Sequence, residues 1–360
     1  MADLRTHFAP GVLTGQDVSD VFALAKQRGF ALPAVNCLGS NSMNAVMETA
    51  AALNSPVVLQ FSHAGAAFLA GHGVHAGAAD RSVLGSIAGA SHVRALAKAY
   101  GARVMLHTDH AAQPLLGWVD GLLDAGEAHF EQTGTPLFSS HMLDLSELPL
   151  EQNLEICVTY LTRMAPLGMT LEIELGITGG EEDGVENSVV APADLYSTPE
   201  EVAFAYEQLI QVSDRFTIAA AFGNVHGVYS PGNVVLTPMI LRDAQHHIAD
   251  KHSTADPRPV DFVFHGGSGS TSEDIAQAIS FGVVKMNIDT DLQWAFWDGV
   301  RSYSVQAAPY LQAQIGNPEG PDRPNKSHYD PKVWLRRGEE AFIERLQQAF
   351  HELNNVDTLD

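Results

Sequence analysis

Residues 260–280 of this 360-residue chain read VDFVFHGGSGSTSEDIAQAIS. The stretch starts as an apolar, β-rich run and ends with the apolar spacing of a helix, and His265 and three glycines lie between the two parts. A strand that leads through a turn into a helix is the repeating unit of parallel α/β folds. The stretch therefore predicts an α/β fold, in which the turn either only connects two elements or also forms one side of a binding site.

The same unit recurs along the whole chain. Eight β-rich runs are present, at 31–37, 56–62, 103–109, 136–144, 170–176, 216–223, 260–267 and 283–289. Amphipathic helical stretches lie between them, for example at 41–54, 89–100 and 271–280. Eight strand–helix units predict either a closed (β/α)8 barrel or an open, doubly wound parallel sheet.

Polar residues at the strand ends distinguish these two folds. Nearly every run starts apolar and ends polar, and the polar residues are Asn36, Ser62, Asp109, Asp144, Glu174, His226, His265, Asn287 and Asp289. A barrel brings the carboxyl ends of all its strands to one rim, whereas an open sheet spreads them along an edge. We therefore predict an α/β fold of the (β/α)8 TIM-barrel type, with its chemistry at this rim.

About 70 residues follow the eighth strand. Residues 304–332 are rich in proline and polar residues and predict an ordered loop or arm, and residues 333–353 predict an amphipathic helix. We expect residues 1–360 to form a single barrel domain, with residues 304–360 as a C-terminal arm and helix packed on the barrel.

Composition limits the classes of partner. The net charge is −23, which disfavours nucleic acid and anionic membranes as partners. Cys37 and Cys157 are the only cysteines, so neither a disulfide framework nor a cysteine-rich zinc site is indicated. The N-terminal residues do not read as a signal peptide, and no apolar run reaches 18 residues, so we expect a cytoplasmic protein.

Three histidines, His110, His226 and His265, follow strands whose ends meet at the predicted rim. Three imidazoles match a catalytic zinc site with one open position, although each one alone also fits a packed or surface histidine. Strand alternation pairs His107 with Asp109, so His110 can join the site only if its strand has already ended, and spacing alone does not choose between His107 and His110.

Carboxylates accompany these histidines. Asp109 is placed to act as a general acid or base, or to orient a histidine. Asp144 and Glu174 could bind a second cation, or could form an internal salt bridge with Lys285. Glu172 shares one face of its strand with Glu174, and two carboxylates inside a barrel require partners.

Two further loops suggest a substrate. Residues 177–192 form a long loop with two acidic candidates, Glu181 and Glu182, which suits either a lid over a substrate or a solvated turn. The turn HGGSGS at 265–270 and the turn NIDT at 287–290 follow the last two strands, where barrels frequently bind phosphate, although the glycines also suit a plain connection. A Lewis acid beside a sugar phosphate would stabilise an enediolate, which is better supported than Schiff-base chemistry at Lys285.

Five motifs resemble those of the longer-chain class II fructose-bisphosphate aldolases. They are HTDH at 107–110, LEIELGITGGEEDG at 171–184, FGNVHGVY at 222–229, FHGGSGS at 264–270 and KMNIDTD at 285–291. The similarity extends from about residue 10 to residue 336. It implies reversible, zinc-dependent cleavage of fructose 1,6-bisphosphate into dihydroxyacetone phosphate and glyceraldehyde 3-phosphate.

The resemblance also implies a role for individual residues. His110, His226 and His265 would bind the catalytic zinc, and Asp144 and Glu174 a second divalent metal. Asp109 would exchange a proton with the C4 hydroxyl, and Glu182 would deprotonate dihydroxyacetone phosphate in the condensation direction. The substrate-binding residues would be Asn36, Ser62, Gly227, Gly266, Gly267, Ser268, Asn287, Ile288, Asp289, Thr290 and Lys332. The family also uses a monovalent cation, K⁺ or Na⁺, near the phosphate and is usually a homodimer.

The chain departs from the family pattern at Lys332, where arginine is frequent. Lysine keeps the positive charge but loses the two-pronged hydrogen bonding of a guanidinium group to the far phosphate. Three other functions remain as alternatives: an aldolase of the same class acting on tagatose or sedoheptulose bisphosphate, a zinc amidohydrolase barrel, and a non-catalytic sugar-phosphate sensor. The first strand lacks the H-x-H pair of the hydrolases, and a sensor has no need of both Asp109 and Glu182.

Overall fold

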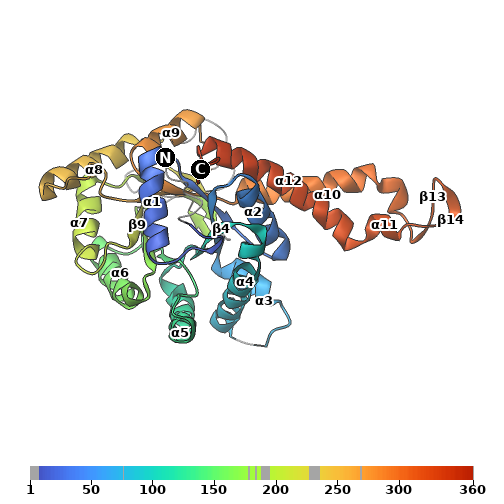
Figure 1. The fold of residues 1–360 in the computed structure, drawn as a ribbon, viewed down its shortest axis with the longest axis horizontal. Helices are drawn as coiled ribbons and strands as arrows, with labels where there is room; N and C mark the ends of the chain where they lie inside the picture. Colours follow the sequence, from blue (N-terminus) through green and yellow to red (C-terminus); the bar gives the residue numbers. More distant parts are fainter. Residues whose placement is uncertain are drawn as a thin grey trace.

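The structure is a computed structural model that describes residues 8–75, 77–176, 179–182, 185–187, 195–226, 236–267 and 270–359. Eight parallel strands form a closed barrel (Figure 1). The strands are β2 (Leu32–Asn36), β3 (Pro56–Phe61), β4 (Arg103–Thr108), β5 (Ser140–Leu143), β6 (Thr170–Leu175), β9 (Phe216–Ala220), β11 (Phe262–Phe264) and β12 (Val283–Ile288). Closure is made by β12, which pairs with β2 from Lys285↔Leu32 to Ile288↔Val35. The predicted (β/α)8 barrel is therefore confirmed.

Helices connect successive strands on the outside of the barrel. They are α2 (Ser40–Ala52), α3 (His63–Ala70), α4 (Ala78–Tyr100), α5 (Leu116–Thr133), α6 (Leu150–Met164), α7 (Pro199–Leu209), α8 (Met239–His252) and α9 (Ser272–Ser280). Side-chain caps define several of their starts: Thr198 accepts a hydrogen bond from the backbone N–H of Glu201, and Thr271 accepts one from that of Asp274. No helix among the described residues is long and apolar enough to cross a membrane.

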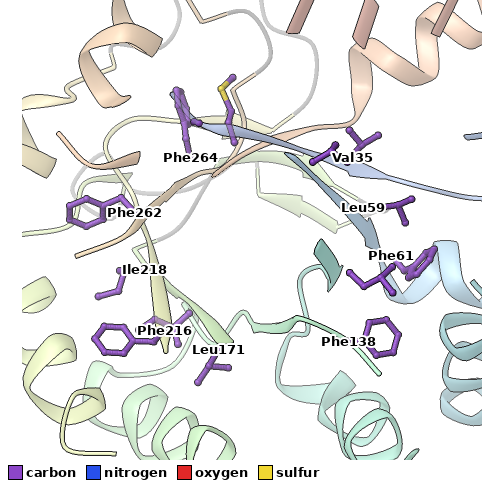
Figure 2. Packing of buried hydrophobic residues seen from close by; sticks show 14 of the residues in the cluster. Val35, Leu59, Phe61, Phe138, Leu171, Phe216, Ile218, Phe262 and Phe264 are labelled. Carbon is purple, nitrogen blue, oxygen red and sulfur yellow. The ribbon is translucent and has the colours of Figure 1, made fainter. Parts of the chain in front are cut away.

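Alternation along the strands separates an apolar outer face from the barrel interior. Side chains on the outer face pack between the strands and the helices, and Figure 2 shows Leu59 and Phe61 of β3 and Phe262 and Phe264 of β11 among them. The neighbours of these residues along each strand point inward. Glu172 of β6 contacts Lys285 of β12, although three strand-to-strand steps separate the two strands, so this contact crosses the interior.

The amino-terminal end of the interior is filled by apolar side chains. Leu32, Ala34, Val58 and Met105, on the lower halves of three strands, form one buried cluster with residues of α1 (Gln16–Arg28). We call these four strand residues the barrel floor.

The fourth strand is shorter than the predicted run at 136–144. A short strand, β1 (Gly11–Val12), occupies the edge of β4 at Arg103 and Val104, so β5 pairs with β4 only at His107 and Thr108. The residues before β5 are held differently, because Ser139 uses its side chain to accept a hydrogen bond from the backbone N–H of Leu106.

The C-terminal segment forms an arm that projects from the barrel (Figure 1). It contains α10 (Thr290–Gln306), a hairpin of β13 (Ile315–Asn317) and β14 (Gly320–Pro324), α11 (Lys326–Tyr329) and α12 (Pro331–Glu352). The end of α12 returns to the barrel, where Phe342, Leu346 and Phe350 join the main core. The stretch at 304–332, expected as a loop or arm, thus has regular structure, and the expected helix at 333–353 is α12.

Candidate active site

The rim of the barrel brings together residues from strands far apart in the chain. Strand β4 ends at Thr108, so Asp109 and His110 follow it directly, and His265 follows β11 in the same way. Glu174 lies near the end of β6, and Asp144 comes directly after β5. Because β4 ends at Thr108, strand alternation no longer applies to His110, and its side chain can face the rim together with that of Asp109. This was the condition under which His110, and not His107, would join the site.

Three of these residues form a group that could hold a metal ion. Ligand atoms of His110, Glu174 and His265 all lie within 4.8 Å of one another. Nδ1 of His110 lies 3.2 Å from Oε2 of Glu174, and Nδ1 of His265 lies 3.6 Å from the same oxygen. The two imidazole rings meet edge to face, with their centroids 4.6 Å apart. Imidazole and carboxylate groups are suitable ligands for zinc and related divalent ions.

The electrostatics of this group favour a positive charge. Burial and the neighbouring His110 act to lower the pKa of His265, but hydrogen bonds with Glu172 and Glu174 outweigh them and raise this pKa to about 9. Burial would raise the pKa of Glu174, yet the two histidines hold it well below its usual range. The site therefore stabilises positive charge beside an ionised carboxylate, as a cation site requires.

Asp144 lies at the edge of this group. Its Oδ2 is 2.9 Å from Nδ1 of His110, and its Oδ1 accepts hydrogen bonds from the backbone N–H and the hydroxyl of Ser146. Of the two residues predicted for a second metal position, Glu174 belongs to the His/Glu/His group, and Asp144 contacts that group through His110.

Asp109 is buried beside the candidate metal group and is held by two amides. Nδ2 of Asn36 donates to its Oδ2 at 2.9 Å, and Nδ2 of Asn287 donates to its Oδ1 at 3.1 Å. Burial would raise the pKa of this carboxyl group, but its neighbours His110 and Lys285, with His265 and His107, lower it to about 2. Asp109 is therefore an ionised carboxylate with a fixed orientation at neutral pH, and it can accept a proton from a bound hydroxyl group.

The salt bridge of Lys285 differs from the predicted alternative. Its Nζ lies 2.9 Å from both carboxylate oxygens of Glu172, not at Asp144 or Glu174. Oε1 of Glu172 also accepts a hydrogen bond from Nε2 of His265 at 2.8 Å. The two inward carboxylates, which needed partners inside the barrel, therefore both have them. Glu172 contacts Lys285 and His265, and Glu174 contacts His110 and His265.

The two turns predicted to bind phosphate follow neighbouring strands. Pairing of β11 with β12 at Val263↔Lys285 and Phe264↔Met286 shows that the strands leading into these turns are neighbours. Gly266 has a φ of 60°, in the region that favours glycine. A Cβ on Gly267 would lie 2.0 Å from Cε of Met286, so the backbone there approaches its neighbour very closely. Ile288, Asp289 and Thr290 span the end of β12 and the start of α10.

Several predicted residues have little or no structural description. Gly227 and Ser268 lie outside the described residues. His226 is described through its backbone, in the strand β10 (Val225–His226), which pairs with β7 (Gly179–Glu182) at His226↔Gly180. Glu182 ends β7, which pairs in turn with β8 (Val185–Asn187). This small sheet links the loops after β6 and β9, while the assignments of His226 and Glu182 to the site remain predictions.

Two other predicted contacts lie at different places in the fold. Ser62 is buried and caps α3, where its hydroxyl accepts a hydrogen bond from the backbone N–H of Gly65 at 3.1 Å. Lys332 lies at the start of α12, the end of this helix farther from the barrel, with 87% of its side chain exposed (Figure 1). Its Nζ lies 3.7 Å from Asp330. Within the described part of this chain, Lys332 is therefore not joined to the other site residues.

Two polar residues support the site without having been singled out in the sequence. Gln60 is buried, and its Nε2 donates to Oδ1 of Asn36 at 2.5 Å. Asn224 is buried, and its Nδ2 donates to the backbone carbonyl of His265 at 3.0 Å. Gln60 has the same strand parity as Ser62, and this alternation is the signal that would have placed it in the interior.

A closed parallel barrel with a His/Glu/His group, of which Glu174 and His265 are buried, and a fixed carboxylate at its rim is typical of metal-assisted barrel enzymes. The family model for fructose-bisphosphate aldolase class-II matches residues 16–358. The chain is 59% identical to fructose-bisphosphate aldolase class 2 of Escherichia coli (strain K12) over 360 residues, which cover 100% of each protein. It is also 59% identical over 360 residues to fructose-bisphosphate aldolase of Haemophilus influenzae, again with 100% of each protein covered.

A solved structure agrees with the sequence comparison. The crystal structure of fructose-bisphosphate aldolase from Campylobacter jejuni superposes with a TM-score of 0.89 at 55% sequence identity, covering 97% of each chain. The chain belongs to the class II fructose-bisphosphate aldolase family.

Proposed function

We propose that this chain cleaves fructose 1,6-bisphosphate reversibly into dihydroxyacetone phosphate and glyceraldehyde 3-phosphate, and that the barrel rim is its active site. The observation that carries the proposal is the His110/Glu174/His265 group beside the fixed carboxylate of Asp109, in a member of the class II family. An aldol cleavage needs both a means of stabilising charge on the carbonyl oxygen and a base for the hydroxyl proton.

His110, His226 and His265 would hold a catalytic zinc ion, with Asp144 and Glu174 offering a second divalent position. The donor atoms of the described residues fit this use, because two imidazoles and a carboxylate lie within one coordination sphere of each other. Bound zinc supplies Lewis acidity that stabilises the negative charge developing on the substrate oxygen. A K⁺ or Na⁺ ion near the phosphate would complete the cofactors.

Asp109 takes the proton of the C4 hydroxyl group in the cleavage direction and returns it in condensation. Its low pKa makes it a carboxylate before substrate binds, and the amides of Asn36 and Asn287 keep both of its oxygens in place. Glu182, on β7, removes a proton from dihydroxyacetone phosphate when the reaction runs toward condensation. The small sheet that pairs β7 with β10 supports this role, because it connects the Glu182 strand with the strand that carries His226.

The ketose phosphate binds at the turns after β11 and β12. Backbone N–H groups near glycines approach an anion closely, and the start of α10 adds a favourable helix dipole. The residues that would contact substrate are Gly227, Gly266, Gly267, Ser268, Asn287, Ile288, Asp289 and Thr290, with Asn36 and Ser62 toward the remainder of the molecule. We further propose a cytoplasmic homodimer.

Metal removal combined with a substrate panel tests this function. Chelator treatment should abolish cleavage of fructose 1,6-bisphosphate, and added Zn²⁺ should restore it. Tagatose and sedoheptulose bisphosphates, measured in parallel, should be cleaved with lower kcat/KM. Activity that survives metal removal, or that is lost on borohydride treatment with substrate, would instead indicate Schiff-base chemistry at a lysine.

A further inference from the structure

The ion pair between Lys285 and Glu172 lies inside the barrel, and the proposed reaction uses neither residue directly. Each residue is only 2% exposed. Nζ of Lys285 lies 2.9 Å from Oε1 and 2.9 Å from Oε2 of Glu172, so the carboxylate plane is fixed by contact with both of its oxygens. Buried ion pairs are not in general better for stability than apolar residues of the same size. A role other than stability is therefore worth seeking.

Glu172 also contacts the imidazole of His265. Nε2 of His265 lies 2.8 Å from Oε1, the oxygen nearest to it, and an ionised carboxylate can only accept this hydrogen bond. The hydrogen bond assigns a proton to Nε2, so a metal ion would bind the ring through Nδ1, in place of the second proton of the imidazolium. Nδ1 is the atom that faces Oε2 of Glu174, at 3.6 Å, in the His/Glu/His group.

His107 completes the surroundings of the pair from a third strand. Its Nδ1 lies 2.7 Å from the hydroxyl of Ser140, and its Nε2 lies 3.7 Å from Oε2 of Glu172. Lys285, His107 and His265 thus surround the carboxylate from β12, β4 and the end of β11. The hydroxyl of Thr217 also donates to Oε2 of Glu172, at 3.5 Å, so the carboxylate is held from several sides behind the His265 ring.

We propose that the Lys285–Glu172 pair positions His265, fixing the ring and its tautomer so that Nδ1 points to the metal group. Lys285 acts through Glu172, and Glu172 acts through the hydrogen bond to Nε2. Hydrogen-bond acceptors behind a metal-binding histidine commonly tune metal affinity in this way. The inference rests on the proposed function to the extent that His265 is taken as a metal ligand.

Two double variants separate positioning from charge balance. Glu172→Gln with Lys285→Met, and Glu172→Leu with Lys285→Met, both remove the two buried charges and keep similar volumes. Only the glutamine variant retains an oxygen that can accept a hydrogen bond from Nε2 of His265. Zinc dissociation constants are measured by competition with a chelating dye, visible spectra are recorded on the cobalt-loaded proteins, and urea unfolding is followed on the metal-free proteins.

Positioning predicts that the leucine variant binds zinc about 10–100-fold more weakly than the original protein, and that the glutamine variant recovers most of this loss. Equal zinc affinities of the two variants would overturn the proposal. If the leucine variant is also less stable to urea, weaker zinc binding could reflect the lost stability, and the visible spectrum at saturating cobalt distinguishes the two causes. Bands that are shifted relative to those of the glutamine variant support positioning of His265. Identical bands overturn the proposal.

His265→Ala distinguishes this inference from the proposed function. If this variant keeps the zinc affinity of the original protein, His265 is not a ligand and the metal assignment itself is wrong. If it loses zinc while the leucine double variant binds normally, the ligand assignment stands and only the positioning role is refuted.

Discussion

Asn287→Ala tests how Asp109 is held in the active site. The substitution removes the 3.1 Å hydrogen bond from Nδ2 of Asn287 to Oδ1 of Asp109 and leaves the 2.9 Å bond from Asn36 to the other oxygen. Asp109 is buried and ionised, so the lost bond is one between an amide and a charged acceptor. Such a bond contributes about 1.5–3 kcal/mol.

This energy predicts two separate effects. The bond also orients the carboxylate, and a misalignment that costs a similar energy in the transition state lowers kcat roughly ten- to hundredfold. The same loss destabilises the carboxylate and raises the pKa of Asp109 from about 2 by roughly 1 to 2. Because the raised pKa still lies well below 6, Asp109 stays ionised, and the ratio of activities at pH 6 and pH 8 should remain that of the original protein.

The assay is steady-state cleavage with coupled detection of the triose phosphates, repeated between pH 6 and pH 8. Asn44→Ala is a matched control, because it removes an amide that contacts Nε2 of His92 at 2.9 Å between α2 and α4, outside the barrel interior. The control should keep its kcat. A kcat for Asn287→Ala within twofold of the original value would refute the reasoning, and so would a new loss of activity between pH 8 and pH 6.

Two further predictions concern proton exchange on dihydroxyacetone phosphate and the stability of the folded protein in acid. Glu182→Ala should suppress exchange of the C–H proton of dihydroxyacetone phosphate with solvent while the zinc content is unchanged; loss of zinc would make Glu182 a ligand instead of a base. His141 is buried, which lowers its pKa from 6.5 to about 3, so the unfolded state binds the extra proton and stability falls as the pH drops below 6.5. Between pH 7.5 and pH 5 this linkage removes about 2 kcal/mol, so His141→Asn should lose that much less in urea unfolding; an equal loss in both proteins would contradict the assignment.

Local sequence patterns predicted the barrel and much of its rim because those features depend on short-range periodicity. Strand alternation placed Glu172 and Glu174 on one inward face, and the polar strand ends indicated convergence at one rim. His110 also follows from a local rule once β4 is known to end at Thr108.

Pairing across the interior could not be predicted in the same way. Lys285 meets Glu172 because of the tilt and stagger of the strands, which place particular residues at the same height in a closed barrel. The same stagger lets β1 take the lower edge of β4 and shortens β5 to Ser140–Leu143. The place of Lys332 depends on the course of the C-terminal arm, which residue periodicity does not encode.

The barrel floor and the rim of the barrel should differ in how mutations affect them, since the first affects stability and the second affects catalysis. Leu32, Ala34, Val58 and Met105 belong to one buried apolar cluster with residues of α1, and none of them is proposed to contact substrate or metal, so changes in their size act first on packing. A mutant library confined to these four positions should vary widely in melting temperature while its folded members share similar turnover numbers. Directed evolution toward heat resistance could therefore begin at one end of this barrel and leave the other end untouched.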